Sequence, residues 1–157
     1  MGATLAALVG THRSNIESIV LWDPIVNGKG YIQELMALHQ DWLRHTFPKP
    51  KQAEKKKEDN GSIEISGFPL TYIMRNGLET IDLLTIKQRP ANHILIIEDN
   101  EKDDVILLQD HLKNINFHLD YQYIPGPKVW LLRGMAGALV PSQLLQSIVS
   151  WISKVCL

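Results

Sequence analysis

The feature that most constrains the fold of this chain is the segment at positions 93–97, His-Ile-Leu-Ile-Ile, which leads directly into an acidic loop at 98–104. A short run of branched apolar residues that ends at polar loop residues predicts a strand. Val105, Leu108 and Leu112 follow at helical spacing and share one helix face. The pattern therefore predicts a strand, an acidic loop and a helix in succession, with acidic groups where open parallel sheets hold ligands and catalytic groups.

Two further segments predict strands of the same sheet. Residues 19–22, Ile-Val-Leu-Trp, form a short apolar run that Asp23-Pro24 closes, because proline cannot donate to a strand ladder. Residues 117–123 alternate between apolar and polar side chains, and helices are predicted at 2–9 and from Pro141 onward. The apolar side of this last helix is formed by Leu145, Ile148, Val149 and Ile152. Strands and helices in this alternation predict an α/β fold with about three parallel strands flanked by helices.

The middle of the chain, residues 28–88, is predicted to be a cap-like insertion between the first and second strands. It opens with an amphipathic helix at 30–47, which prolines at 48 and 50 end. Residues 49–61 contain five lysines and almost nothing to bury, so we expect a solvated, mobile loop. A weakly alternating segment at 63–68 and a helix-like segment interrupted at Gly77 complete the insertion.

Composition excludes several classes of function. The formal net charge is -1, so the chain has no overall field that would attract nucleic acid, and no segment is long and apolar enough to span a membrane. The single cysteine, Cys156, cannot form an intramolecular disulfide, and a cytoplasmic location is the default expectation. The pairs His39 with His45 and His111 with His118 lack the one-turn spacing of metal ligands, so we expect no metal and no cofactor.

Taken locally, residues 93–112 resemble the opening of a response-regulator receiver domain, in which paired acidic residues after the first strand help to hold magnesium. A receiver also needs an aspartate for phosphorylation after a later strand, then a hydroxyl residue and a lysine. Only residues 113–157 remain for these parts. Residues 117–157 contain a single acidic residue, Asp120. The local match therefore does not extend to a complete receiver domain.

A second resemblance covers most of the chain. The segments at 2–8, 19–26, 67–70 and 100–103 are similar to α/β-hydrolase sequence and occur in the right order. More narrowly, the order Leu-Trp-Asp-Pro, Gly-Tyr, Glu-Leu and Leu-His between positions 21 and 39 resembles the exosortase-system-associated hydrolases, a bacterial branch linked to polysaccharide and protein-sorting loci. The resemblance implies that residues 1–157 are a single truncated α/β-hydrolase-like domain, the C-terminal part of that fold with a helical cap insertion.

The resemblance also implies positions for a catalytic triad. If Gly2 is the last glycine of the nucleophile elbow, the nucleophile would lie two residues earlier, outside this chain. Asn-Glu-Lys-Asp at 100–103 matches the family turn that carries the acid, so Asp103 is the candidate acid and Asp23 the alternative; both also fit ordinary solvated turns. The family histidine belongs in residues 126–140, which contain none.

Two hypotheses about function follow. The first is a hydrolase-like protein without catalysis of its own, a binding or interaction module with a cleft near Asp23, Glu98 and Asp103. The second is an ester or thioester hydrolase whose nucleophile is supplied by a half that this chain lacks.

The truncation also predicts self-association. In the complete fold the strand at 19–22 is paired on both sides, and the helix at 2–9 is covered. An exposed strand edge beside apolar side chains recruits another strand. We therefore expect a homo-oligomer joined through the N-terminal helix and the first strand.

Overall fold

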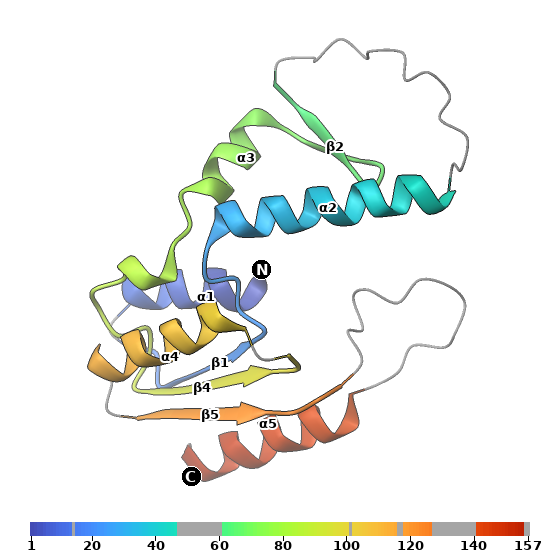
Figure 1. Cartoon of the computed structure of the whole chain (residues 1–157). Coiled ribbons are helices and arrows are strands. Elements are labelled where there is room, and N and C mark those ends of the chain that lie inside the picture. Colours follow the sequence, from blue (N-terminus) through green and yellow to red (C-terminus); the bar gives the residue numbers. More distant parts are fainter. Residues whose placement is uncertain (14, 47–60, 101, 116–117, 127–140, 156–157) are drawn as a thin grey trace. The chain divides into compact units, whose positions relative to one another are not determined.

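A computed structural model describes residues 1–13, 15–46, 61–100, 102–115, 118–126 and 141–155 of the chain (Figure 1). The structure divides into two compact units. The first comprises Met1–Val26 and Leu83–Leu157, and the second comprises Asn27–Asp82. The first unit is a mixed α/β structure that contains all the parallel strands.

The first unit is built on a three-stranded parallel sheet in the order β1-β4-β5. Its strands are β1 (Ser18–Trp22), β4 (His93–Glu98) and β5 (Leu119–Tyr123). The register pairs Leu21 with Ile96 and Ile96 with Tyr121. This arrangement confirms the prediction of three parallel neighbouring strands flanked by helices.

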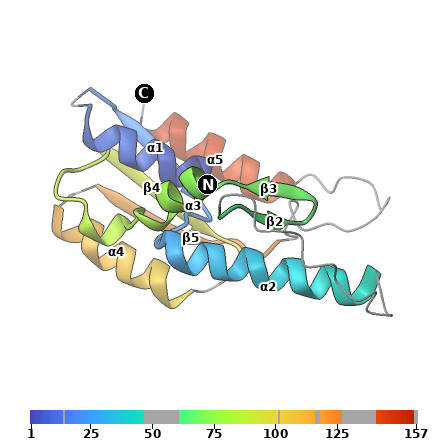
Figure 2. The same cartoon turned by 90° about the horizontal axis from the view of Figure 1, so that it is seen from above.

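Helices cover both faces of the sheet, which explains the unbroken apolar run of the central strand. The helices are α1 (Gly2–Thr11), α4 (Asp103–Ile115), the short 3-10 turn η1 (Leu83–Thr85) and α5 (Ser142–Val155). Ile94 and Ile96 pack with α1, α4 and η1, whereas Leu95 and Ile97 pack with α5. Figure 1 shows α1 and α4 on one side of the sheet and α5 on the other, and Figure 2 shows the same helices from above.

The apolar stripe predicted for α4 is confirmed, whereas only Ile148 of the four residues predicted to form the apolar side of the last helix packs on the sheet. Val105, Leu108 and Leu112 of α4 are fully buried. In α5, Leu145, Val149 and Ile152 are exposed. The face that packs on the sheet consists of Leu144, Ile148, Trp151 and Val155. Polar contacts select this face, because the indole Nε1 of Trp151 donates to Oδ2 of Asp120 at 2.7 Å and Ser147 hydrogen-bonds Gln122.

The second unit contains two helices and a hairpin, namely α2 (Gly28–Thr46), β2 (Ile63–Ile65), β3 (Phe68–Leu70) and α3 (Tyr72–Glu79). The antiparallel hairpin turns at Ser66 and Gly67, which both have positive φ (52° and 87°), as a two-residue turn of this kind requires. The Thr71 side chain accepts from the Met74 N–H and caps α3, which then runs through Gly77 without the predicted interruption. These elements lie inside the predicted insertion at 28–88, which itself stays a prediction.

Two sequence predictions fall outside the described residues. The first concerns the lysine-rich loop at 49–61, of which only Gly61 is described, and the second concerns Cys156. Within the part of the chain that the structure describes, no helix is long and apolar enough to cross a membrane.

Candidate functional site

The carboxyl ends of the parallel strands bring acidic residues together at one edge of the sheet. Asp23 follows β1, Glu98 ends β4 and Asp99 comes next. The hydrogen bonds from the Asp23 N–H to the Ile97 carbonyl and from the Ile124 N–H to the Glu98 carbonyl, each 2.9 Å, extend the pairing past the strands. The predicted emergence of Asp23 and Glu98 at the same edge is therefore confirmed.

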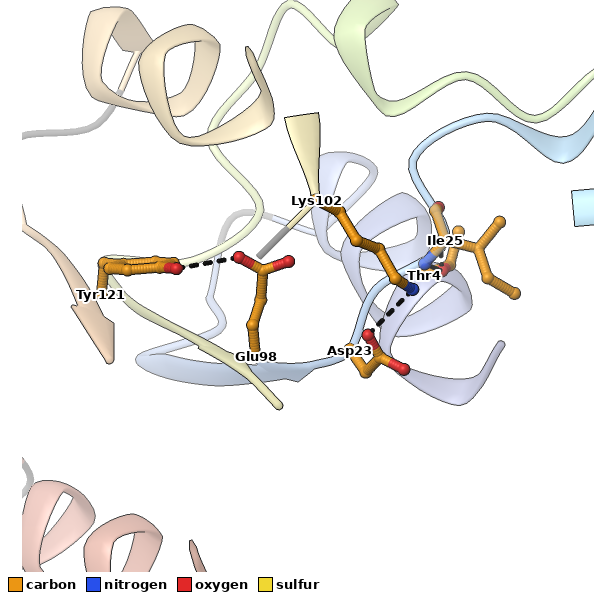
Figure 3. Close-up of polar contacts among 6 residues, drawn as sticks. All are labelled: Thr4, Asp23, Ile25, Glu98, Lys102 and Tyr121. Carbon is orange, nitrogen blue, oxygen red and sulfur yellow. Dashed lines mark hydrogen bonds and ion pairs between the residues drawn. The ribbon is translucent and has the colours of Figure 1, made fainter. Parts of the chain in front are cut away.

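Asp23 is held in an unusual backbone conformation. Its φ of 46° lies in the left-handed region, which aspartate tolerates better than most residues. Its side chain is 10% exposed and forms an ion pair with Lys102, the Nζ to Oδ1 distance being 3.1 Å (Figure 3). Lys102 precedes α4, so this ion pair joins the loop after β1 to the start of the helix.

A buried threonine fixes the loop that carries Asp23. The Thr4 hydroxyl of α1 donates to the Ile25 carbonyl at 3.1 Å and accepts from the Ile25 N–H at 2.8 Å. Thr4 has no exposed surface, so its hydroxyl depends on Ile25 for both hydrogen bonds. The position of the loop is therefore set by α1 as well as by β1.

Glu98 is the most unusual acid of this edge, because it is fully buried. Its Oε2 accepts a hydrogen bond of 2.9 Å from the Tyr121 hydroxyl, and its Oε1 has no hydrogen-bond partner among the described residues. Burial raises the pKa of the Glu98 carboxyl, while the Tyr121 hydrogen bond and the charge of Lys102 act in the opposite direction. In Figure 3 the second carboxyl oxygen points away from Tyr121. This carboxyl can therefore hold a proton at a pH where an ordinary glutamate has lost it.

The sequence-predicted acid Asp103 lies apart from this buried group. It is the first residue of α4 and is exposed. A carboxylate in the first turn of a helix interacts favourably with the helix dipole, which accounts for its presence there. Asp23, the alternative acid, is the one that the structure places beside Glu98 and Lys102.

A pocket of about 190 Å³ opens at the same edge, on the α5 face of the sheet. It is lined by Trp22, Asp99, Ile124, Pro125, Gly126, Pro141, Ser142, Gln143 and Leu144. Asp99 is 6% exposed, and its carboxylate contributes a negative charge to the lining. Trp22 contributes an aromatic surface, and the remaining side chains are mainly apolar or uncharged.

The described histidines of this unit do not reach the carboxyl edge. His93 and His118 stack at the opposite edge with ring centroids 4.7 Å apart. Five residue steps of about 3.3 Å separate His93 from Glu98, which amounts to roughly 16 Å. His12 and His111 contact the carbonyls of Leu8 and Ile86 respectively.

Among the described residues of the first unit, no histidine lies at this edge. Within the described ranges, no group of three possible ligand side chains could hold a metal ion. Residues 127–140, most of the stretch in which the hydrolase resemblance places a histidine, lie outside the described residues.

Sequence reasoning missed Thr4, Lys102 and Tyr121 as parts of the site. Tyr121 could have been placed on the correct face by strand alternation, but its contact with Glu98 depends on the register between β4 and β5. No signal in the sequence links Thr4 to Ile25, 21 positions away.

Comparison with known proteins adds no relative. No protein-family model matches the chain, and no match was found among the curated proteins or the solved structures. The fold and the chemistry of the site are therefore the basis for assigning a function.

Proposed function

We propose that this chain is a hydrolase-like binding domain that holds a small molecule at the carboxyl edge of its parallel sheet and does not turn it over. The observation that supports this most directly is the pocket lined by both Trp22 and Asp99. Trp22 is the last residue of β1, and Asp99 follows β4, the strand that pairs with β1. Open parallel sheets bind ligands at this edge.

The lining of the pocket favours a ligand with a flat apolar body and a cationic or hydrogen-bond-donating group. Asp99 contributes a carboxylate to the lining, and a carboxylate attracts cations and hydrogen-bond donors. An aromatic face such as that of Trp22 attracts cations as well as apolar rings. At about 190 Å³ the pocket suits a small amine or the end of a larger ligand.

The proposal that the chain does not turn its ligand over is supported by the position of the described histidines of the first unit. A serine or water nucleophile needs a base within hydrogen-bond reach, and His93 and His118 lie at the other edge of the sheet. The α/β-hydrolase relationship is supported by the Leu-Trp-Asp-Pro motif at the end of β1 and by the parallel strands that follow it. The alternative is an ester or thioester hydrolase whose nucleophile lies outside this chain.

Binding can be tested by following the Trp22 indole N–H signal in a nitrogen-correlated NMR spectrum, assigned with Trp22→Phe. Benzylamine, which carries a ring and a cation, should move this signal in a saturable way, whereas benzoate should not. Asp99→Asn should weaken the benzylamine effect at least tenfold. The matched variant Asp110→Asn, on the exposed side of α4, should leave it unchanged. Equal responses to benzylamine and benzoate would contradict the proposal.

The absence of catalysis has a separate test. The purified chain should not hydrolyse p-nitrophenyl esters above the buffer rate, and a fluorophosphonate probe should label no serine. Stoichiometric labelling would overturn the proposal and favour the hydrolase alternative.

We also propose that copies of the chain associate through α1 and β1. Leu5 and Val9 of α1 are 49% and 56% exposed, and β1 lies at one end of the strand order and pairs with β4 alone among the described strands. Light scattering at tens of micromolar should give a mass above the 17.8 kDa of one chain. Leu5→Lys with Val9→Lys should restore the monomer, whereas Leu107→Lys on α4 should not. A wild-type monomer would contradict this proposal.

A further inference from the structure

A second pocket, of about 490 Å³, lies at the opposite, amino edge of the sheet. One wall comes from the end of α1 and the residues after it, including Thr11, His12 and Arg13. The other wall comes from the segment before β4, including Gln88, Arg89 and Asn92. None of the residues that line it is acidic.

The charges of this pocket are not neutralised from within. Neither Arg13 nor Arg89 has an ion-pair partner in the part of the chain that the structure describes, and both are exposed. Arginine remains protonated at any physiological pH. The lining of the pocket therefore includes two arginines, one from each of the two segments, and both are available to a ligand.

Backbone contacts fix the distance between the two walls. A Cβ added to Gly10 would lie 2.3 Å from the Pro90 carbonyl oxygen, so the close approach of the two segments requires glycine there. Hydrogen bonds from the Asn92 N–H to the Ile16 carbonyl (3.1 Å) and from the His93 N–H to the Glu17 carbonyl (2.9 Å) join them further. The walls are thus positioned before any ligand arrives.

Two nearby negative groups reduce the positive potential without cancelling it. The carboxyl end of α1 faces this edge, and a helix end carries about half an elementary charge. The carbonyls of Val9 and Gly10 already accept from the N–H groups of His12 and Arg13. The Glu17 side chain accepts from the Asn92 amide (2.8 Å) and lies 3.7 Å from the His93 ring, so it is engaged beside the pocket.

We propose that this pocket binds the phosphate group of a small phosphate monoester, held between Arg13 and Arg89. Guanidinium groups bind phosphate oxygens in pairs of parallel hydrogen bonds, and two of them match the charge of a phosphate dianion. The side-chain amide of Gln88 is a further donor in the lining. The site is concave, which favours a small molecule over a flat anionic surface.

The probe for the test is phenyl phosphate, titrated at constant ionic strength so that screening stays the same. It should bind, and Arg13→Gln and Arg89→Gln should each weaken binding at least tenfold. Arg44→Gln, which removes an exposed arginine from α2, is the matched control and should change binding less than twofold. Equal weakening by all three variants would show a general charge effect and overturn the proposal.

A second measurement on the wild-type chain removes any dependence on the folding of the variants. Phenyl phosphate should shift the amide signals of residues 11–13 and 88–92 and leave the Trp22 indole signal in place. Absence of binding, or shifts that spread over all exposed amides, would overturn the proposal. Vesicles with an anionic phospholipid should not compete with phenyl phosphate, and competition by them would assign the site to a lipid headgroup instead.

Discussion

The two edges of the same parallel sheet have opposite chemistry. The carboxyl edge holds three carboxyl groups, those of Asp23, Glu98 and Asp99, which are buried or nearly so. The amino edge holds the exposed guanidinium groups of Arg13 and Arg89. A net charge of -1 for the whole chain conceals this separation. A near-neutral composition therefore does not exclude two local sites of opposite charge.

The difference extends to how each edge is built. Side chains hold the carboxyl edge together, through the Thr4 hydroxyl, the Lys102 ion pair and the Tyr121 hydroxyl. Backbone contacts at Gly10 and Asn92 hold the amino edge, whose charged side chains face water. Substitutions at the carboxyl edge should consequently alter stability, and substitutions at the amino edge should alter binding alone.

The largest effect is expected at β4, which joins the two edges. Ile96 is fully buried in the core shared by α1, α4 and η1. Ile96→Ala should lower the free energy of unfolding by about 2–5 kcal/mol, because it removes buried methylene groups and leaves a cavity. Urea unfolding measures this. The control is Ile106→Ala in α4. Because Ile106 is 45% exposed, the free energy of unfolding should change by less than about 1 kcal/mol.

A smaller effect, restricted to the carboxyl edge, is expected for Thr4→Val. This change keeps the shape of the side chain but leaves the N–H and carbonyl of Ile25 without their partner, at a cost of about 1–3 kcal/mol. Thr11→Val at the amino edge removes a hydroxyl that donates to the Leu8 carbonyl. The Leu8 carbonyl also contacts the His12 ring nitrogen at 2.9 Å, so it keeps a partner and the cost there should be below about 1 kcal/mol. Equal costs would contradict the proposed difference between the edges.

The next effect is a dependence of stability on pH at the carboxyl edge. Burial raises the pKa of the folded Glu98 carboxyl above its unfolded value. Glu98 therefore contributes fully to stability at a pH below the pKa that it has in the unfolded chain. This contribution is lost as the pH rises through the pKa that Glu98 has in the folded chain. Glu98→Gln, which mimics the protonated form, should remove this loss in urea unfolding between about pH 4 and 8. Parallel pH profiles of the two proteins would contradict the role assigned to Glu98.

The smallest effect is expected for the ion pair between Lys102 and Asp23. Because the Lys102 side chain is 31% exposed, Lys102→Met should cost no more than about 1 kcal/mol. The cost should shrink in high salt, which screens the pair. Arg89→Gln at the amino edge should leave the unfolding midpoint unchanged at any salt concentration. A destabilised Arg89→Gln protein would mean that the two edges are built alike.

The strands and the acidic edge could be predicted from the sequence because their signals are local. The short, branched apolar run before Glu98 predicts a strand covered on both faces, and the helices between the strands predict the parallel order. In α5, however, apolar residues form two overlapping helical stripes. The hydrogen bond between Trp151 and Asp120, which selects the buried stripe, joins residues 31 positions apart.

Contacts between distant segments explain what else could not be predicted. The amino-edge pocket depends on the approach of Gly10 to Pro90, and neither residue signals the other in the sequence. The same holds for Lys102, whose contact with Asp23 spans 79 positions. Local patterns predict which residues leave a strand at a given edge, but they do not predict which partners arrive from other elements.

The most direct test of two independent sites is a single NMR titration of the wild-type chain with benzylamine and then phenyl phosphate. Benzylamine should move the Trp22 indole signal, and phenyl phosphate should then move the amides of residues 11–13 and 88–92 with an affinity that the first ligand leaves unchanged. Competition between the two ligands, or one ligand that moves both sets of signals, would contradict the account of two edges with separate and opposite chemistry.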